Sequence, residues 1–190
     1  MIFYCERTKL LEAASKLQSI VGAKTSMPIL EGILISAEQG KITLVAYNLE
    51  MGMKKEIYAK CEEAGDIVIN ARLLNEILRK MNGTTVEISA DDRLNCNIKC
   101  GDATFDIMGM SATDFPEIPS LNNANSFSIE GKLLNQMKKG TSFAAAVTEG
   151  SKPILTGINI SLFDGFIQFV AIDGYRLAIK KENINIDKNR

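Results

Sequence analysis

The chain has 190 residues, a formal net charge of −1, 46% hydrophobic residues and no histidine. This length accommodates one large or two small domains, and the charge excludes a protein that is basic overall while leaving a local basic face possible. Without histidine, the chain supplies neither an imidazole base nor a histidine-ligated metal site.

The first predicted elements are a strand, a helix and a β-hairpin. Ile2 to Cys5 predicts a short strand, and Thr8 is a candidate N-cap for a helix that ends near Val21. Alternating apolar residues from Pro28 to Met53, interrupted by a polar turn, predict the hairpin. Met51 to Lys60 continues the alternation and predicts a third strand.

The next stretch predicts a second helix and further strands. Glu62 to Asp66 is interpreted as a polar turn and Ile67 to Ile69 as a brief strand. Asn70 is expected to cap a helix from Ala71 to Met81, which stops at Asn82-Gly83. Turn-forming residues separate the three strands that follow, which are Thr85–Ser89, Leu94–Lys99 and Ala103–Met108.

After a polar linker from Ser120 to Asn125, the pattern starts again. Phe127 to Glu130 predicts a strand, and Gly131 to Ala145 predicts a helix. The apolar residues expected on the inward face of this helix are Leu133, Leu134, Met137 and Phe143. A loop then leads to Pro153, where a second hairpin begins.

Pro153 to Ala178 repeats the hairpin segment Pro28 to Met53 at a constant offset of 125 residues. Eleven of the first nineteen positions are identical, so we expect two related domains, residues 1–121 and 122–190. The second copy stops before a counterpart of the second helix. We therefore expect a fragment of a longer protein; the alternative is a natural half-domain with unpaired sheet edges.

Basic residues recur on the predicted helices seven residues apart, which places each pair on one stripe. The pairs are Lys9 and Lys16, Arg72 and Arg79, and Lys132 and Lys139. The plain interpretation is a solvated helix face, and Glu12 and Glu76 weaken the stripes. If nucleic acid is the partner, these long cations would attract phosphates without reading bases, as suits a protein that slides on duplex DNA.

No set of residues in the sequence predicts catalysis or metal binding. The acidic residues considered fall in predicted turns, where they form local hydrogen bonds; they are Asp91-Asp92, Glu62-Glu63 and Asp164. The cysteines lack CxxC spacing and are interpreted as reduced, buried hydrophobes: Cys5, Cys61, Cys96 and Cys100. With no signal peptide and no apolar run of membrane length, we expect a cytoplasmic protein without catalytic residues, metal or cofactor.

The two hairpins diverge at their ends. The first continues as Tyr47-Asn48-Leu49-Glu50, whereas the second continues as Ile172-Asp173-Gly174-Tyr175-Arg176-Leu177. Asp173-Gly174 is first of all a turn into the next strand. The same stretch also places an aromatic, an arginine and a leucine near Leu155, which suits a small apolar groove for a peptide.

Four motifs resemble the bacterial DNA polymerase III beta subunit family, the sliding clamps. They are MPIL at 27–30, NLEMGM at 48–53, DFP at 114–116 and AIDGYRLA at 171–178. The resemblance covers the whole chain in order. It implies a clamp fold of similar domains, each with two helices facing a central hole and sheets outside, and a third domain beyond this chain. It also implies that two subunits close head to tail into a ring around duplex DNA.

By position, the resemblance assigns three groups of residues. Lys24 matches a basic loop residue that contacts DNA in relatives, and Arg72 lies beside or at another such residue. One side of the groove for short linear peptides of polymerases and the clamp loader matches Leu155, Ile172, Gly174, Tyr175, Arg176 and Leu177. Ile172 and Tyr175 replace a threonine and a histidine of better-known relatives, which implies a somewhat different peptide preference. Phe105 and Ile107 match the apolar part of the subunit interface.

These observations lead to one expected function and one alternative. We expect a non-catalytic processivity factor that encircles duplex DNA and tethers the replicative polymerase. The alternative is a stand-alone adaptor of two related modules that binds nucleic acid or a peptide.

Overall fold

A computed structural model describes residues 1–21, 27–119, 127–147 and 152–184. The chain divides into unit 1, residues 1–119, and unit 2, residues 120–190. Each unit combines helices with antiparallel sheets, which confirms the predicted α+β class. No described helix is long and apolar enough to cross a membrane.

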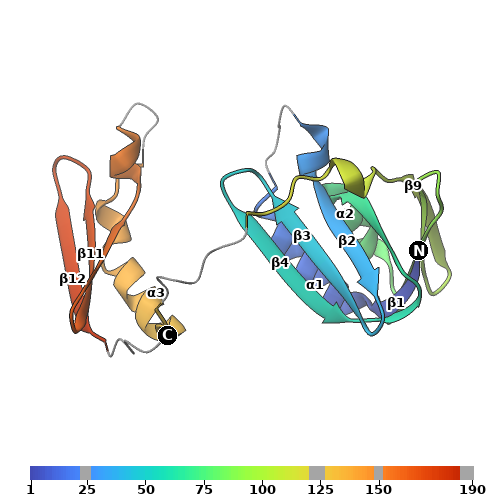
Figure 1. The fold of residues 1–190 in the computed structure, drawn as a ribbon, viewed down its shortest axis with the longest axis horizontal. Helices are drawn as coiled ribbons and strands as arrows, with labels where there is room; N and C mark the ends of the chain where they lie inside the picture. Colours follow the sequence, from blue (N-terminus) through green and yellow to red (C-terminus); the bar gives the residue numbers. More distant parts are fainter. Residues whose placement is uncertain (22–26, 120–126, 148–151, 185–190) are drawn as a thin grey trace. The chain divides into compact units, whose positions relative to one another are not determined.

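Unit 1 contains two antiparallel sheets (Figure 1). The five-stranded sheet has the order β5-β1-β7-β8-β9, with bounds Lys60–Glu63, Ile2–Glu6, Thr85–Ala90, Asn95–Cys100 and Ala103–Met108. The four-stranded sheet has the order β4-β3-β2-β6, with bounds Gly52–Tyr58, Lys41–Tyr47, Gly32–Glu38 and Gly65–Asn70. Both sheets contribute one face to the main apolar core.

Two helices of unit 1 cover this core. Helix α1, Arg7–Gln18, buries Leu10, Ala13, Ala14 and Leu17. Helix α2, Ala71–Lys80, buries Leu74, Ile77 and Leu78 and begins at the predicted cap, because the side chain of Asn70 accepts from the backbone N–H groups of Arg72 and Leu73 at 3.1 Å each. The Ser15 hydroxyl donates to Asn75 Oδ1 at 2.8 Å and joins the two helices. Their polar faces are therefore neighbours on the side away from the core.

A second, smaller core lies on the opposite face of the four-stranded sheet. It consists of Ile29, Leu30, Val68 and Phe115. Ile29 and Leu30 come from a 3₁₀ turn, η1 (Pro28–Glu31), and Phe115 follows another, η2 (Ala112–Asp114). The segment of residues 110–118 is attached by paired backbone hydrogen bonds between Val68 and Met110, at 3.0 and 2.8 Å. The chain thus covers part of its own sheet.

Unit 2 repeats the hairpin with one helix and a three-stranded sheet. Helix α3 spans Gly131–Lys139, and the sheet has the order β10-β11-β12. The strand bounds are Asn159–Phe163, Phe166–Ile172 and Leu177–Asn183. Met137, Ile167 and Phe169 form the core between helix and sheet. Two 3₁₀ turns complete the unit, η4 at Ser142–Ala144 and η5 at Pro153–Thr156.

Several predicted elements are wrong. Glu6, not Thr8, is the N-cap of α1, and the Thr8 hydroxyl hydrogen-bonds to the Glu6 carboxylate. The turn predicted from Glu62 to Asp66 includes the end of strand β5 and the start of β6. The predicted third strand, Met51 to Lys60, is divided between β4 and β5.

The predicted start of the second repeat also differs from the structure. No strand forms over Phe127–Glu130, and α3 ends at Lys139 rather than Ala145. Gly140 follows the helix, and the Thr141 hydroxyl donates to the Met137 carbonyl at 3.0 Å. Phe143 then lies in η4 and is 58% exposed, so its predicted inward position is wrong. Leu134 is also largely exposed.

Candidate nucleic-acid and peptide interfaces

The predicted DNA-contacting residues of unit 1 that the structure describes lie on the exposed faces of α1 and α2, and glutamates on or beside the same helix pair with most of them. Lys9 pairs with Glu6 at 3.2 Å, Lys16 with Glu12 at 2.6 Å and Arg72 with Glu76 at 3.3 Å. Hydrogen bonding from Lys16 lowers the pKa of the Glu12 carboxyl. These pairs are solvent-exposed and contribute little to stability, so the cations can exchange partners.

Other basic side chains have no ion pair recorded within the described ranges. Arg79 and Lys80, in the last turn of α2, form no such ion pair with the described residues. On α3 of unit 2 the same holds for Lys132, Lys138 and Lys139. Lys24, predicted to contact DNA, lies outside the described residues. The structure therefore brings Lys9, Lys16, Arg72 and Arg79 onto adjacent helices of unit 1 and places Lys132 and Lys139 together on unit 2.

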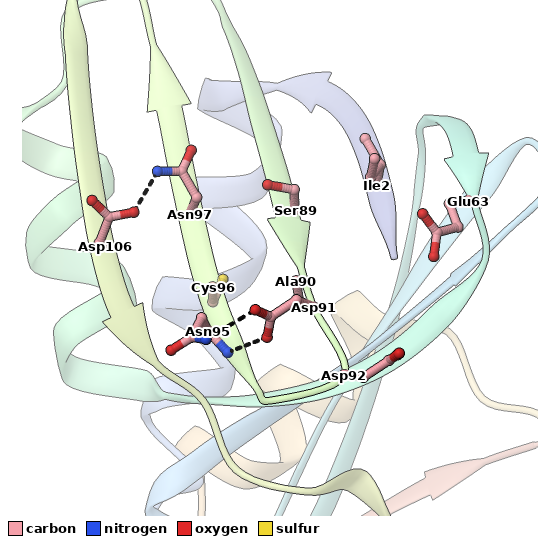
Figure 2. Close-up of a pocket in the computed structure, with 10 residues that line it drawn as sticks. All are labelled: Ile2, Glu63, Ser89, Ala90, Asp91, Asp92, Asn95, Cys96, Asn97 and Asp106. Atoms are coloured by element: carbon pink, nitrogen blue, oxygen red, sulfur yellow. Dashed lines mark hydrogen bonds between the residues drawn. The ribbon is translucent and has the colours of Figure 1, made fainter.

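Acidic residues gather in a different place, at one end of the five-stranded sheet (Figure 2). A pocket of about 500 Å³ is lined by Glu63, Asp91, Asp92 and Asp106, together with Ile2, Ser89, Ala90, Asn95, Cys96 and Asn97. Asn97 donates to Asp106 at 2.6 Å. No group of three or more potential metal ligands occurs in the described part of the chain. The lining of this pocket is therefore acidic and contains no basic residue among the described ones.

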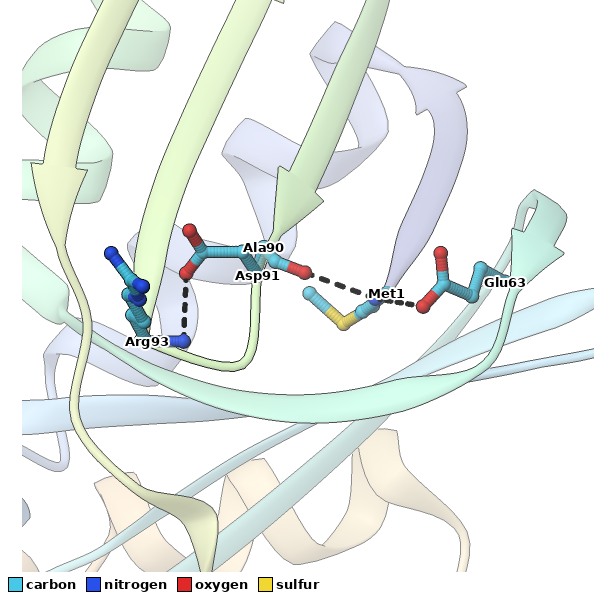
Figure 3. A network of polar contacts seen from close by, with 5 residues as sticks. All are labelled: Met1, Glu63, Ala90, Asp91 and Arg93. Carbon is cyan, nitrogen blue, oxygen red and sulfur yellow. Dashed lines mark hydrogen bonds and ion pairs between the residues drawn. The ribbon is translucent and has the colours of Figure 1, made fainter.

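Two of these acids have local structural partners (Figure 3). Asp91 Oδ1 accepts from the backbone N–H groups of Arg93 and Asn95 at 2.9 Å each, and the Asn95 side chain donates to Oδ2. The hydrogen bonds from Asn95 lower the pKa of Asp91. The N-terminal ammonium of Met1 donates to Glu63 Oε1 and to the Ala90 carbonyl, both at 3.0 Å. The local role predicted for Asp91 is confirmed.

The cysteines do not form a site. All four are free, and Cys5, Cys96 and Cys100 are buried. Burial raises the pKa of the Cys5 and Cys96 thiols to about 12, which keeps them protonated and poorly nucleophilic. Their interpretation as small buried hydrophobes is confirmed for these three residues.

The predicted peptide groove surrounds a tight turn between β11 and β12. Asp173 Oδ1 accepts from the backbone N–H groups of Tyr175 and Arg176 at 2.9 and 2.7 Å. Its Oδ2 pairs with the Arg176 guanidinium, with Nη2 at 2.7 Å. These interactions, first of all the bond from the Arg176 N–H, lower the pKa of Asp173 to about 2. Gly174 takes a positive φ of 92°, which glycine adopts without strain.

This turn presents apolar side chains to solvent. Tyr175 is 98% exposed and Leu177 is 59% exposed. Ile172 pairs with Leu177 across the two strands, and Leu155 lies in η5. Sequence reasoning did not include Asp173 among the site residues, although the Asp-Gly pair indicated the turn. Its side chain holds the turn that carries Tyr175 and Arg176.

Unit 1 contains a turn with the same geometry 125 residues earlier. Asn48 Oδ1 accepts from the backbone N–H groups of Glu50 and Met51 at 3.1 and 2.7 Å, as Asp173 does for Tyr175 and Arg176. Leu49, at the position of Gly174, also has a positive φ, of 73°. The two hairpin ends therefore differ in their side chains and share one backbone turn.

Phe105 and Ile107, predicted at a subunit interface, lie on β9. This strand is at the edge of the five-stranded sheet and pairs only with β8 among the described strands. Both side chains pack partly against the main core, and Met108 beside them is largely exposed. An edge strand with partly exposed apolar residues can accept a further strand.

Duplicated α+β units, in which helices pack on antiparallel sheets, form a fold of the clamp type. The family model described as DNA polymerase III beta subunit, N-terminal domain, matches residues 1–119, and the model for the central domain of that subunit matches residues 128–190. The chain therefore belongs to the DNA polymerase III beta subunit family, as the sequence resemblance predicted.

Individual relatives agree with this assignment. A beta sliding clamp from Chlamydia muridarum is 30% identical over 187 residues, which cover 98% of this chain and 51% of the relative. The beta sliding clamp of Bacillus subtilis is 29% identical, covering 100% of this chain and 52% of the relative. The chain thus spans about half the length of these curated relatives.

Solved structures share the fold. The crystal structure of the DNA polymerase sliding clamp from Bacillus subtilis matches with a TM-score of 0.94 at 28% identity, covering 100% of this chain and 52% of that one. The pol III beta structure from Caulobacter crescentus matches with a TM-score of 0.87 at 30% identity, covering 97% of this chain and 50% of that one. The predicted clamp fold is confirmed.

Proposed function

We propose that this chain forms the first part of a sliding clamp, a non-catalytic ring that encircles duplex DNA and holds the replicative polymerase on it. The observation that carries the proposal is that exposed basic residues lie together on the adjacent helices α1 and α2 of unit 1, at Lys9, Lys16, Arg72 and Arg79. The strands also carry exposed lysines, among them Lys54 and Lys60. Arg79 and Lys80 on α2 lie on the helix side, whereas Asp91, Asp92 and Asp106 line a pocket at the end of a sheet. Phosphates would be attracted to the helices and repelled from that pocket.

The hold on DNA is loose and independent of sequence. Of the five predicted basic contacts in unit 1, the structure describes four, and three of these, Lys9, Lys16 and Arg72, are already paired with glutamates. A contact of these three with a phosphate therefore replaces an existing ion pair. Long, exposed side chains on helices can follow the phosphate backbone without reading base edges. Weak individual contacts allow sliding, while closure of the ring prevents dissociation.

The ring requires surfaces at both ends of the subunit. The free edge of β9, with Phe105 and Ile107, meets a third domain of a second copy in a head-to-tail dimer. The domains of this chain are residues 1–121 and 122–190, and the third domain follows in the longer subunit.

The groove at the end of β11 binds short linear peptides of the polymerase and of the clamp loader. Leu155, Ile172 and Leu177 provide apolar contacts, and Tyr175 and Arg176 form the rim above Gly174. The turn is held by the Asp173 side chain, so the rim is ordered before the peptide arrives, which lowers the entropic cost of binding.

Replacing both Tyr175 and Leu177 by alanine tests the groove. Full-length protein should lose at least a hundredfold in affinity for a fluorescent clamp-binding peptide of the polymerase, because two exposed apolar contacts disappear together. Fluorescence anisotropy measures the affinity. Tyr58→Ala is the matched control, since Tyr58 is also a largely exposed tyrosine, on β4 of unit 1, and should leave binding unchanged. Undiminished binding by the double variant would place the groove elsewhere.

A further inference from the structure

The short segment between α2 and β7 contains the only asparagine of the sequence that is followed by glycine, Asn82 before Gly83. Asn82 is exposed, and among the described residues no hydrogen bond is recorded for its side chain or for the backbone N–H of Gly83. Other asparagines of unit 1 are held in place, since Asn48 and Asn70 each accept from two backbone N–H groups. The side-chain amide of Asn82 is therefore free to rotate toward the following peptide group.

An asparagine and a glycine in this arrangement are the two partners of an intramolecular reaction. The backbone nitrogen of Gly83 forms a bond to the side-chain carbonyl carbon of Asn82, and the bond from that carbon to its NH₂ group breaks. The NH₂ group leaves as ammonia with the proton of the Gly83 amide, and a succinimide ring remains. Water then opens the ring at either carbonyl carbon, which gives aspartate or isoaspartate. Glycine favours ring closure because it has no Cβ atom to hinder the attack and adopts a wide range of backbone angles.

The surroundings of the pair make the isoaspartate product disruptive. Arg7 Nε donates to the Gly83 carbonyl at 2.8 Å, and Arg7 Nη1 donates to the Leu78 carbonyl at 3.0 Å, so this side chain ties the end of α2 to the start of α1. The backbone is closely packed here, since a Cβ atom on Gly83 would lie 2.6 Å from Cys100 Sγ. Isoaspartate lengthens the main chain by one methylene group. The product therefore loosens the attachment of α2.

Both products also change the charge at the basic end of α2. Arg79 and Lys80 lie in the last turn of the helix, and Lys80, Asn82 and Asp102 line one hollow of about 420 Å³. The reaction replaces a neutral amide by a carboxylate beside these cations. The C-terminal end of a helix already carries partial negative charge, so a carboxylate there is unfavourable and opposes the attraction of phosphates.

We propose that Asn82-Gly83 is a site of spontaneous covalent modification, at which the folded protein loses ammonia with time and gains a negative charge at the basic end of α2. The modified protein has a looser helix end and a weaker attraction for DNA. The effect on DNA rests on the proposed function, whereas the modification itself does not.

Peptide mapping by mass spectrometry tests the site. Full-length protein is kept folded at mildly alkaline pH for several days and is then digested. We expect a mass increase of about 1 Da at residue 82, at least about tenfold faster than at Asn135, an exposed asparagine followed by glutamine. Asn82→Gln should abolish the increase in the same peptide. Equal rates at Asn82 and Asn135, or modification of Asn82 only after unfolding in urea, would refute the site.

The effect on DNA is tested with the variant Asn82→Asp, which reproduces the new charge without the extra methylene group. Its affinity for a short linear duplex at low salt should fall by about threefold, and the difference should vanish at high salt. Asn82→Gln is the matched control and should bind as the unsubstituted protein does. If Asn82 is modified and Asn82→Asp binds normally, the weakening of DNA binding is refuted and the site stands. If the unsubstituted protein does not bind the duplex, the proposed function fails instead.

Discussion

One short sequence has two very different environments in this molecule. The residues Pro-Ile-Leu begin both hairpins, yet Ile29 is 8% exposed in unit 1 and Ile154 is 83% exposed in unit 2. The local structure is the same 3₁₀ turn in both. In unit 1 Phe115 is buried against Ile29 and Leu30, whereas the counterpart of the segment 110–118 in the second repeat would lie beyond residue 190. A duplicated sequence thus specifies the same backbone, while the exposure of its side chains depends on the segments that pack against it.

The largest expected effect concerns this pair of isoleucines. Ile29→Ala should lower the free energy of unfolding by about 3 kcal/mol, because it removes a buried side chain and leaves a cavity beside Phe115. In the 190-residue chain, Ile154→Ala should change it by less than about 0.5 kcal/mol, since solvent already surrounds that side chain. Urea unfolding followed by hydrogen exchange in each unit measures both. Equal losses for the two variants would mean that the segment of residues 110–118 does not protect unit 1.

A smaller effect distinguishes the two turns. The pKa of Asp173 is about 2, below its ordinary 3.8, so its contribution to the folded turn is complete above about pH 4 and is lost as the pH falls through 2. Asn48 makes the same backbone hydrogen bonds with an amide that does not titrate. Acid should therefore loosen the turn of unit 2 and leave that of unit 1 intact.

NMR of the turn amides measures this difference. The Tyr175 and Arg176 amide resonances should shift with an apparent pKa near 2, while those of Glu50 and Met51 should not. Asp173→Asn is the matched control, because the geometry at Asn48 indicates that an amide suffices to hold the turn; it should abolish the pH response and keep the turn. A common transition in both turns would show that the carboxylate is not its cause.

The sequence predicted those parts of the fold that depend on local signals. Asn70 caps α2 because its short side chain reaches two free N–H groups, and the strand Ala103–Met108 has the predicted bounds. The polar stretch from Glu62 to Asp66 was misleading, since β5 is an edge strand on β1 and exposes its charged residues although its backbone is paired. Composition alone does not distinguish such a strand from a turn.

The sequence pointed to a candidate groove, which stays a prediction, and did not indicate the contacts within its turn. The divergence of the two hairpins after Ala46 and Ala171 pointed to Tyr175, Arg176 and Leu177. The common turn could not be predicted from the sequence, because the residue pairs Asn48-Leu49 and Asp173-Gly174 differ. In the structure, both pairs nevertheless form the same hydrogen bonds. Ile118 packs on Gly52, although the two residues are far apart in the chain. The spacing of apolar residues in the sequence does not predict this contact.

The central claim is that the chain is part of a ring retained on DNA by closure rather than by tight binding. Full-length protein loaded onto nicked circular DNA and isolated by gel filtration measures it directly. We expect the protein to remain on the circle at a salt concentration that disrupts the exposed ion pairs, and to leave within minutes once a restriction enzyme linearises the DNA. Release at the same rate from circular and linear DNA would contradict the ring.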